Sequence, residues 1–171
     1  IKMILIRFKY RVLNKNVVIS KKAMFYQRTI LSGKGSINIG EEKGRVSVGY
    51  KLGGYYHNRV TEFQARYKSS KIVISENVAF NNSNCLIAGN LIKIGSGCRI
   101  GASVLMMDYE AHGTDPSKRD ELGEFGEIVI GQNVWIGSNT IILKNVYIGD
   151  NCIVAAGSVV IKGSYPKNSI I

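Results

Sequence analysis

The sequence predicts an all-β protein, a single-stranded parallel β-helix built from six-residue repeats with one extruded loop. Three observations support this. A strict six-residue period runs from Ile130 to the C-terminus, two upstream segments share one spacing of apolar residues, and a polar stretch over 106–127 interrupts the pattern. A fixed short period indicates a solenoid whose coils stack on one another. We therefore expect one domain over 1–171, in which 1–16 cap the first coil.

The C-terminal repeat places one large aliphatic residue at the first position of each hexad and a small or β-branched residue at the fifth. An α-helix would need apolar steps of three and four residues, which a strict six does not supply. Six is an even number, so the same side chains stay inward along each strand. The first positions are Ile130, Ile136, Ile142, Ile148, Val154 and Val160, and the fifth are Val134, Thr140, Val146, Cys152, Ser158 and Ser164.

The two upstream segments extend the solenoid nearly to the N-terminus. Their apolar residues are separated by 6, 6 and 8 positions, which predicts coils with the same two-residue insertion on the third side. These residues are Ile19, Phe25, Leu31 and Ile39 in one segment, and Ile74, Phe80, Leu86 and Ile94 in the other. Between them, 49–70 keep no hexad register and are rich in tyrosine and cations. We expect an irregular or looped-out coil there, which lines a cleft, contacts a subunit or only packs.

Charge is distributed unevenly along the chain. Residues 1–71 carry 16 Lys and Arg against 3 Asp and Glu, whereas 72–171 carry 7 against 9. A basic half attracts phosphates, anionic glycans or an anionic inner-membrane surface, or it only keeps the protein in solution. The cations are dispersed and not clustered with aromatic residues, so nucleic acid is not an expected partner. With neither a membrane-spanning apolar run nor a signal-peptide pattern, the sequence predicts a cytoplasmic location.

Cysteine and histidine spacing argues against a metal centre. The three cysteines form no metal-binding or disulfide pattern, and Cys98 and Cys152 occupy fifth positions, where a reduced core thiol is expected. The chain has two histidines, His57 and His112. A three-histidine zinc site of the kind found in γ-class carbonic anhydrases therefore cannot form from this set.

The hexads stop at Met106 and resume at Ile128, and the segment between them contains His112 and Pro116. Loops that leave a rigid repeat often carry functional residues. The single tryptophan, Trp135, falls at a sixth position and is expected to face outward as part of a contact surface.

Three motifs make the resemblance to a known family specific: IGQNVWIGSNTIILKNVYIGDNCIVAAGSVVIK over 130–162, FNNSN over 80–84, and the histidine loop upstream of NVWIGS. The chain resembles the hexapeptide-repeat acyltransferases, in particular galactoside, maltose, nodulation, capsule and lipopolysaccharide O-acetyltransferases. The resemblance implies a left-handed, three-sided helix. The chain differs from the galactoside type at the loop, where His112-Gly113 replaces His-Pro and Asp108 precedes the histidine. This difference favours a glycan or glycan precursor over a free small sugar as the acceptor.

The resemblance also implies direct transfer of an acetyl group from acetyl-CoA to a hydroxyl. His112 would act as general base, because an imidazole titrates near neutral pH. Asp108 or Glu110 would fix its tautomer, and the Ser138 N–H would face the oxyanion. The substrate contacts implied are Asn82, Trp135 and Glu110, and the CoA contacts are Ser138, Ala155, Ala156, Gly157 and Lys162.

The same resemblance implies a homotrimer with active sites between subunits. Two other enzyme functions occur on the same fold and are alternatives to this activity: an antibiotic-modifying acetyltransferase and a nucleotide-sugar N-acetyltransferase. A non-catalytic β-helix scaffold is the alternative from another class.

Overall fold

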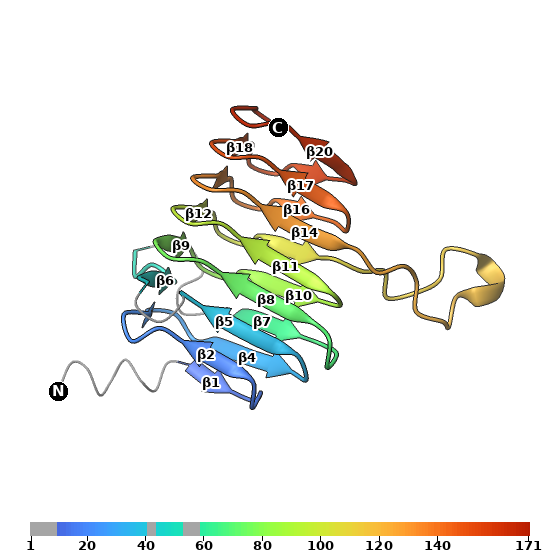
Figure 1. Ribbon diagram of the computed structural model, residues 1–171, viewed down its shortest axis with the longest axis horizontal. Helices are drawn as coiled ribbons and strands as arrows, with labels where there is room; N and C mark the ends of the chain where they lie inside the picture. Colours follow the sequence, from blue (N-terminus) through green and yellow to red (C-terminus); the bar gives the residue numbers. More distant parts are fainter. Residues whose placement is uncertain (1–9, 41–43, 53–58) are drawn as a thin grey trace.

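The computed structural model describes residues 10–40, 44–52 and 59–171, which form a left-handed parallel β-helix (Figure 1). Every pair of neighbouring strands in its three sheets is parallel. Sheet A contains β1 (Tyr10–Val12), β4 (Thr29–Gly33), β7 (Thr61–Ala65), β10 (Cys85–Ala88), β13 (Leu105–Met107), β16 (Ile141–Ile142) and β19 (Val159–Val160). Sheet B contains β2 (Val17–Ile19), β5 (Ser36–Ile39), β8 (Lys71–Ile74), β11 (Leu91–Ile94), β14 (Glu127–Ile130), β17 (Val146–Ile148) and β20 (Gly163–Tyr165). Sheet C contains β3 (Met24–Phe25), β6 (Val46–Val48), β9 (Val78–Phe80), β12 (Arg99–Ile100), β15 (Trp135–Ile136) and β18 (Ile153–Val154).

The predicted aliphatic columns form the core. On sheet B, Ile39 pairs with Ile74, which pairs with Ile94, and this column continues through Ile130 to Ile148. These five side chains are almost completely buried. Burying one such side chain contributes about 1.5–3 kcal/mol, so the stacked columns supply the main driving force for coiling.

Asparagines form the turns where the chain passes from one sheet to the next. Asn133, Asn139, Asn145 and Asn151 all have φ between 53° and 60°, in the left-handed region that asparagine tolerates better than most residues. At the corner between sheets B and C, the Asn133 amide donates to Asn151 at 3.0 Å, and Asn151 donates to Asn168 at 3.2 Å. The polar residues between the columns therefore satisfy one another from coil to coil.

The stretch 49–70, for which we expected an irregular coil, contains a regular strand. β7 lies between β4 and β10, and its Phe63 occupies the buried column position between Leu31 and Leu86. The chain therefore completes a coil here, with its extra residues placed in the connection between β6 and β7. Tyr55, Tyr56 and His57 lie outside the described residues.

Two predicted boundaries shift. Met106 and Met107 belong to β13, and Met106 is fully buried between Leu86 and Ile142 because it fills the aliphatic column. The extruded segment is therefore 108–126. At the other end, Tyr10–Val12 pair with β4, so the N-terminal stretch that we expected to be a cap supplies a strand of the first coil. Among the described residues, no helix is long and apolar enough to cross a membrane.

Candidate functional site

A groove of about 660 Å³ runs along the outer surface of sheet C, at its corner with sheet A. Trp135, 57% exposed, stands on one side, and Ser138 lies at the turn after β15. The groove crosses several coils, from Tyr26 and Tyr50 near its N-terminal end to Ala155 and Ala156 near its C-terminal end. Trp135, Ser138, Ala155 and Ala156, all predicted site residues, are thus brought together.

The backbone N–H of Ser138 makes no hydrogen bond with any of the described residues, and the column at this corner explains why. One coil earlier, the Ala102 N–H donates to the Ser138 hydroxyl at 3.0 Å. Further down, the Tyr50 N–H donates to the Asn82 side chain at 2.7 Å. The equivalent position above Ser138 is Ala156, which has no side-chain acceptor. An open donor in a groove can stabilise a negatively charged oxygen.

Two glycines allow the close approach of backbone around this N–H. A Cβ at Gly101 would lie 2.5 Å from the Ser138 nitrogen, and one at Gly137 would lie 2.4 Å from the Ala156 nitrogen. Any other residue at these corners would force the coils apart, so the open donor depends on glycine at both positions.

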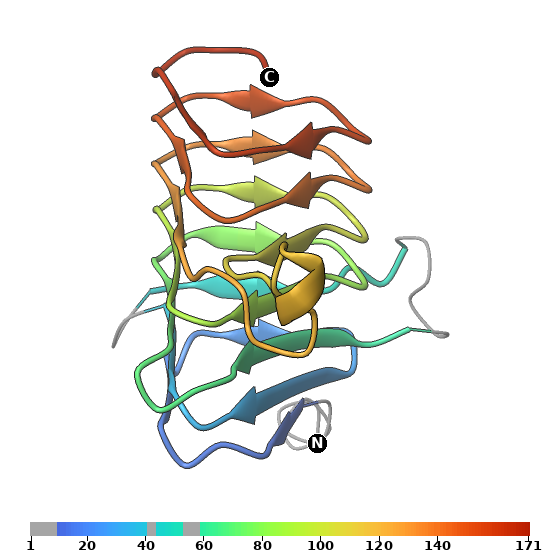
Figure 2. The same ribbon diagram turned by 90° about the vertical axis from the view of Figure 1, so that its right-hand side faces the viewer.

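The extruded segment 108–126 is a hairpin, not an irregular loop. Its stem has an antiparallel bridge between Tyr109 and Phe125. The Glu110 N–H donates to the Glu124 carbonyl at 2.9 Å, and the Gly123 N–H returns to the Glu110 carbonyl at 3.1 Å. The hairpin projects from the corner between sheets A and B, on the side away from β12 and β18 (Figure 1) and toward the viewer in Figure 2.

His112 lies on this hairpin with an exposed side chain. Its Nδ1 is 2.9 Å from the Arg119 carbonyl oxygen, so this nitrogen carries the proton and donates. In the neutral imidazole, Nε2 is then the unprotonated nitrogen, and a general base needs such a nitrogen. A backbone carbonyl therefore sets the tautomer, the task that we had expected of Asp108 or Glu110.

Asp108 has a different role from the one predicted. Its side chain is fully buried and accepts hydrogen bonds from the Gly89 N–H at 2.5 Å and the Asn90 N–H at 3.0 Å. Burial raises the pKa of this carboxyl, although the backbone hydrogen bonds oppose the shift. Asp108 ties the start of the hairpin to the turn between β10 and β11, and it does not contact His112.

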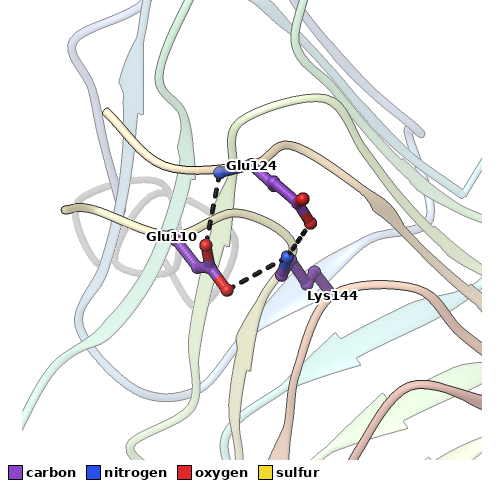
Figure 3. A network of polar contacts seen from close by, with 3 residues as sticks. All are labelled: Glu110, Glu124 and Lys144. Atoms are coloured by element: carbon purple, nitrogen blue, oxygen red, sulfur yellow. Dashed lines mark hydrogen bonds and ion pairs between the residues drawn. The ribbon is translucent and has the colours of Figure 1, made fainter. Parts of the chain in front are cut away.

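Glu110 contributes to an ion-pair network at the hairpin stem (Figure 3). Lys144, at the corner after β16, lies 3.0 Å from the Glu110 carboxylate and 2.6 Å from that of Glu124. Hydrogen bonding with Lys144 lowers the pKa of Glu124, and the same bond raises the pKa of Lys144. One ammonium therefore joins both arms of the stem to the next coil. Sequence reasoning missed Lys144, whose hexad position resembles that of any solvated corner lysine.

A second contact fixes the stem on its other side. Tyr109 stacks on Phe125 with ring centroids 5.6 Å apart, and Tyr67 meets both rings edge-on. The Arg66 guanidinium donates to the Tyr109 hydroxyl. Burial raises the pKa of that hydroxyl. Tyr67 and Arg66, from the stretch expected to be irregular, thus support the hairpin.

Three further predicted residues lie outside the groove lining. Asn82 is fully buried, and its amide both accepts from the Tyr50 N–H and donates to the Tyr50 carbonyl, at 2.9 Å. It holds the coil beneath it, and Asn81 lines the groove in its place. Gly157 has φ of 79° and forms a corner. Lys162 is near enough to Glu124 to lower the pKa of that carboxyl slightly, which places it on the hairpin side.

The hairpin and the groove lie on different corners of one chain. None of the described groove-lining residues comes from 108–126. No group of three or more metal-ligating side chains occurs within the described part of the chain. Cys98 and Cys152 are buried free thiols, as predicted, and burial raises the pKa of Cys98.

Comparison with known proteins supports the assignment of the repeat. Residues 127–162 match the family model described as bacterial transferase hexapeptide (six repeats), which confirms the predicted resemblance in the C-terminal coils. The chain is 31% identical over 110 residues to WbbJ of Escherichia coli K12, which carries the name of a lipopolysaccharide biosynthesis O-acetyl transferase. This match covers 58% of the chain and 55% of WbbJ, so the chain spans about half the length of that relative.

Two solved structures match the chain along nearly its whole length. A mutant of AntD, an N-acyltransferase from Bacillus cereus, in complex with dTDP-4-amino-4,6-dideoxyglucose and coenzyme A, matches 99% of this chain and 83% of its own, with a TM-score of 0.54 and 19% identity. The hexapeptide-repeat acetyltransferase VCA0836 of Vibrio cholerae, complexed with acetyl coenzyme A, matches 99% and 69%, with a TM-score of 0.49 and 20% identity. The likeness to AntD supports the fold of the chain.

Proposed function

We propose that the protein is an acetyl-CoA-dependent O-acetyltransferase that acts on a hydroxyl of a cell-surface polysaccharide or its sugar precursor. The observation that carries this proposal is the Ser138 N–H, an unpaired donor in the wall of a 660 Å³ groove. Such a donor suits the oxyanion that forms when a hydroxyl attacks a thioester carbonyl. The WbbJ match and the hexapeptide match over 127–162 agree with acetyl transfer to a glycan.

In this proposal the thioester lies between Ser138 and Trp135, and the pantetheine arm extends past Ala155 and Ala156. These residues line the C-terminal end of the groove, and the alanines leave room for a ligand against the backbone. The acceptor then occupies the N-terminal end, beside Asn81 and Tyr50.

His112 is the proposed general base. Its Nε2 takes the proton of the acceptor hydroxyl as the oxygen attacks the thioester carbonyl, and the proton then passes to the departing thiolate of CoA. The imidazole and the groove lie on different corners of one chain, so the hairpin of one copy completes the groove of its neighbour. A closed trimer provides three such sites.

The test is release of free CoA from acetyl-CoA with a panel of glycan and sugar acceptors. Wild-type protein should release thiol only with a suitable acceptor, and His112→Ala should lower the rate by about 100-fold or more. Arg119→Ala is a matched control, because its backbone carbonyl still holds the His112 Nδ1. Absence of turnover together with absence of CoA binding would instead support the scaffold alternative. A normal rate in His112→Ala would refute the role of His112 as base and leave the proposed acetyl transfer standing.

A further inference from the structure

A second cavity adjoins the groove on sheet C, on the side of the corner between sheets B and C. It has a volume of about 270 Å³ and shares Ser47, Ala79 and Arg99 with the groove. Arg45, which precedes β6, lines its far side. None of the described residues that line either cavity is acidic. Two guanidinium groups thus meet one continuous surface on which these residues place no carboxylate.

Arg99 is held in place by the backbone. Its Nη1 donates to the carbonyl oxygens of Asn77 at 2.7 Å, and of Gly97 and Cys98 at 3.0 Å each. The Nε and Nη2 atoms make no hydrogen bond with the described residues and remain available. A guanidinium that is fixed before binding loses little conformational entropy, and its planar fork matches the oxygens of a phosphate.

The described residues form two ion pairs, and Lys144 takes part in both. Neither arginine therefore forms an ion pair within the described part of the chain. Among the described residues, no ion-paired carboxylate therefore offsets the Coulomb attraction of these arginines for an anion. The sequence of residues 1–71 carries 16 Lys and Arg against 3 Asp and Glu, and this excess of positive charge favours an anionic ligand.

The position of the two arginines assigns them to one substrate. The open Ser138 N–H lies between the alanine end of the groove and the arginine end. Tyr50, 55% exposed, and Tyr26 line the groove toward the arginines. An aromatic face and a cationic fork together suit a sugar that carries a phosphate ester.

We infer that Arg99 and Arg45 form a phosphate subsite for the acceptor, so the acceptor is a sugar bearing a phosphate or diphosphate and not a neutral glycan chain. The anion subsite rests on the geometry of the two cavities alone. Its assignment to the acceptor rests on the proposed function.

Calorimetric titration with inorganic pyrophosphate tests the subsite without catalysis. Pyrophosphate should bind the wild type, and Arg99→Gln and Arg45→Gln should each weaken it about tenfold or more, since a charge-assisted hydrogen bond is lost. Lys93→Gln is the matched control, because this exposed cation on sheet B lies away from both cavities. Thermal unfolding checks that each variant is folded. Equal pyrophosphate affinity in all four proteins would overturn the subsite.

Titration with CoA and kinetics with acceptors then separate the two substrates. CoA affinity should change less than about twofold in Arg99→Gln. A nucleoside diphosphate sugar and the corresponding sugar 1-phosphate should both lose kcat/KM about tenfold or more in that variant, while the unphosphorylated sugar loses almost nothing. If Arg99→Gln weakened CoA instead, the phosphate would belong to the donor and the acceptor assignment would fail. Intact pyrophosphate binding without any acetyl transfer would keep the subsite and refute the proposed function.

Discussion

At the scale of single residues, the groove depends on what one corner position carries in successive coils. Asn82 and Ser138 place a side-chain acceptor on the N–H of the coil below, at Tyr50 and Ala102. Ala156 cannot do this for Ser138. Because position 156 has no hydroxyl, the Ser138 N–H stays unpaired among the described residues, and the proposed chemistry uses this N–H.

Ala156→Ser should close this donor. The new hydroxyl would accept from the Ser138 N–H in the same way that Ser138 accepts from Ala102. Loss of one oxyanion donor typically lowers kcat by 10²–10³, so we expect a fall of about 100-fold. Steady-state kinetics measures it, and Ala102→Ser, the same change two coils away, should leave kcat nearly unchanged. Similar rates for both variants would argue against the Ser138 role.

Asp108 should matter for stability and not for proton transfer. Asp108→Ala leaves the buried Gly89 N–H and the partly buried Asn90 N–H without their acceptor, which should lower the free energy of unfolding by about 2 kcal/mol. Urea denaturation measures this change. The pH profile of kcat should keep its midpoint, because the His112 tautomer is set by the Arg119 carbonyl. A shifted midpoint would restore Asp108 as a partner of the base.

At the scale of elements, the hairpin 108–126 is held by contacts from three other parts of the helix. Asp108 reaches the turn between β10 and β11, Tyr109 meets Arg66, and Lys144 bridges Glu110 and Glu124. Lys144 is partly buried, with 18% of its side chain exposed. His112, the proposed base, is thus carried on a stem with a defined direction.

Lys144→Met should loosen that stem. The two carboxylates lose their shared cation and repel each other, so the Glu124 amide should exchange with deuterium faster and kcat should fall about tenfold. Hydrogen–deuterium exchange followed by mass spectrometry measures the opening without any substrate. Lys93→Met is the control, because Lys93 is an exposed cation on sheet B that makes no ion pair among the described residues. Equal exchange in the two variants would contradict a positioning role.

The pH dependence of the stem follows from Glu124. Lys144 lowers the pKa of this carboxyl below its ordinary 4.5. A depressed pKa means that the stabilisation is present above about pH 4.5 and is lost as the pH falls through the folded value. NMR titration of the Glu124 carboxyl should give a midpoint below 4.5 in the wild type and a return toward 4.5 in Lys144→Met. A midpoint unaffected by the substitution would show that the ion pair is not formed in solution.

Sequence alone predicts the coils well where each aliphatic residue has an equivalent six positions away. It fails at β7, because the insertion between Val48 on sheet C and Phe63 on sheet A breaks the six-residue spacing of these two successive core positions. It also assigns Met106 to the loop, although an unbranched methionine fills the aliphatic position as isoleucine does. The partners of Asp108 and Lys144 lie 18 to 34 residues away, so no local pattern reveals them.

At the scale of the whole molecule, the proposed site is divided between two corners of the β-helix. The groove on sheet C has the open N–H but no histidine among its described lining residues. The hairpin between sheets A and B carries the proposed base but projects away from the groove (Figure 1). A rigid coil stack cannot fold one corner onto the other, so the proposed mechanism requires a second copy to unite them.

Mixing two inactive variants tests this requirement most directly. The base variant, His112→Ala, keeps an intact groove, and the groove variant, Ala156→Ser, keeps an intact hairpin. Co-refolded in equal amounts, they should regain about a quarter of wild-type kcat, since random closed assemblies place an intact hairpin on an intact groove at that frequency. Acetyl-CoA turnover measures the recovery. A mixture no more active than either variant alone would contradict a site shared between copies.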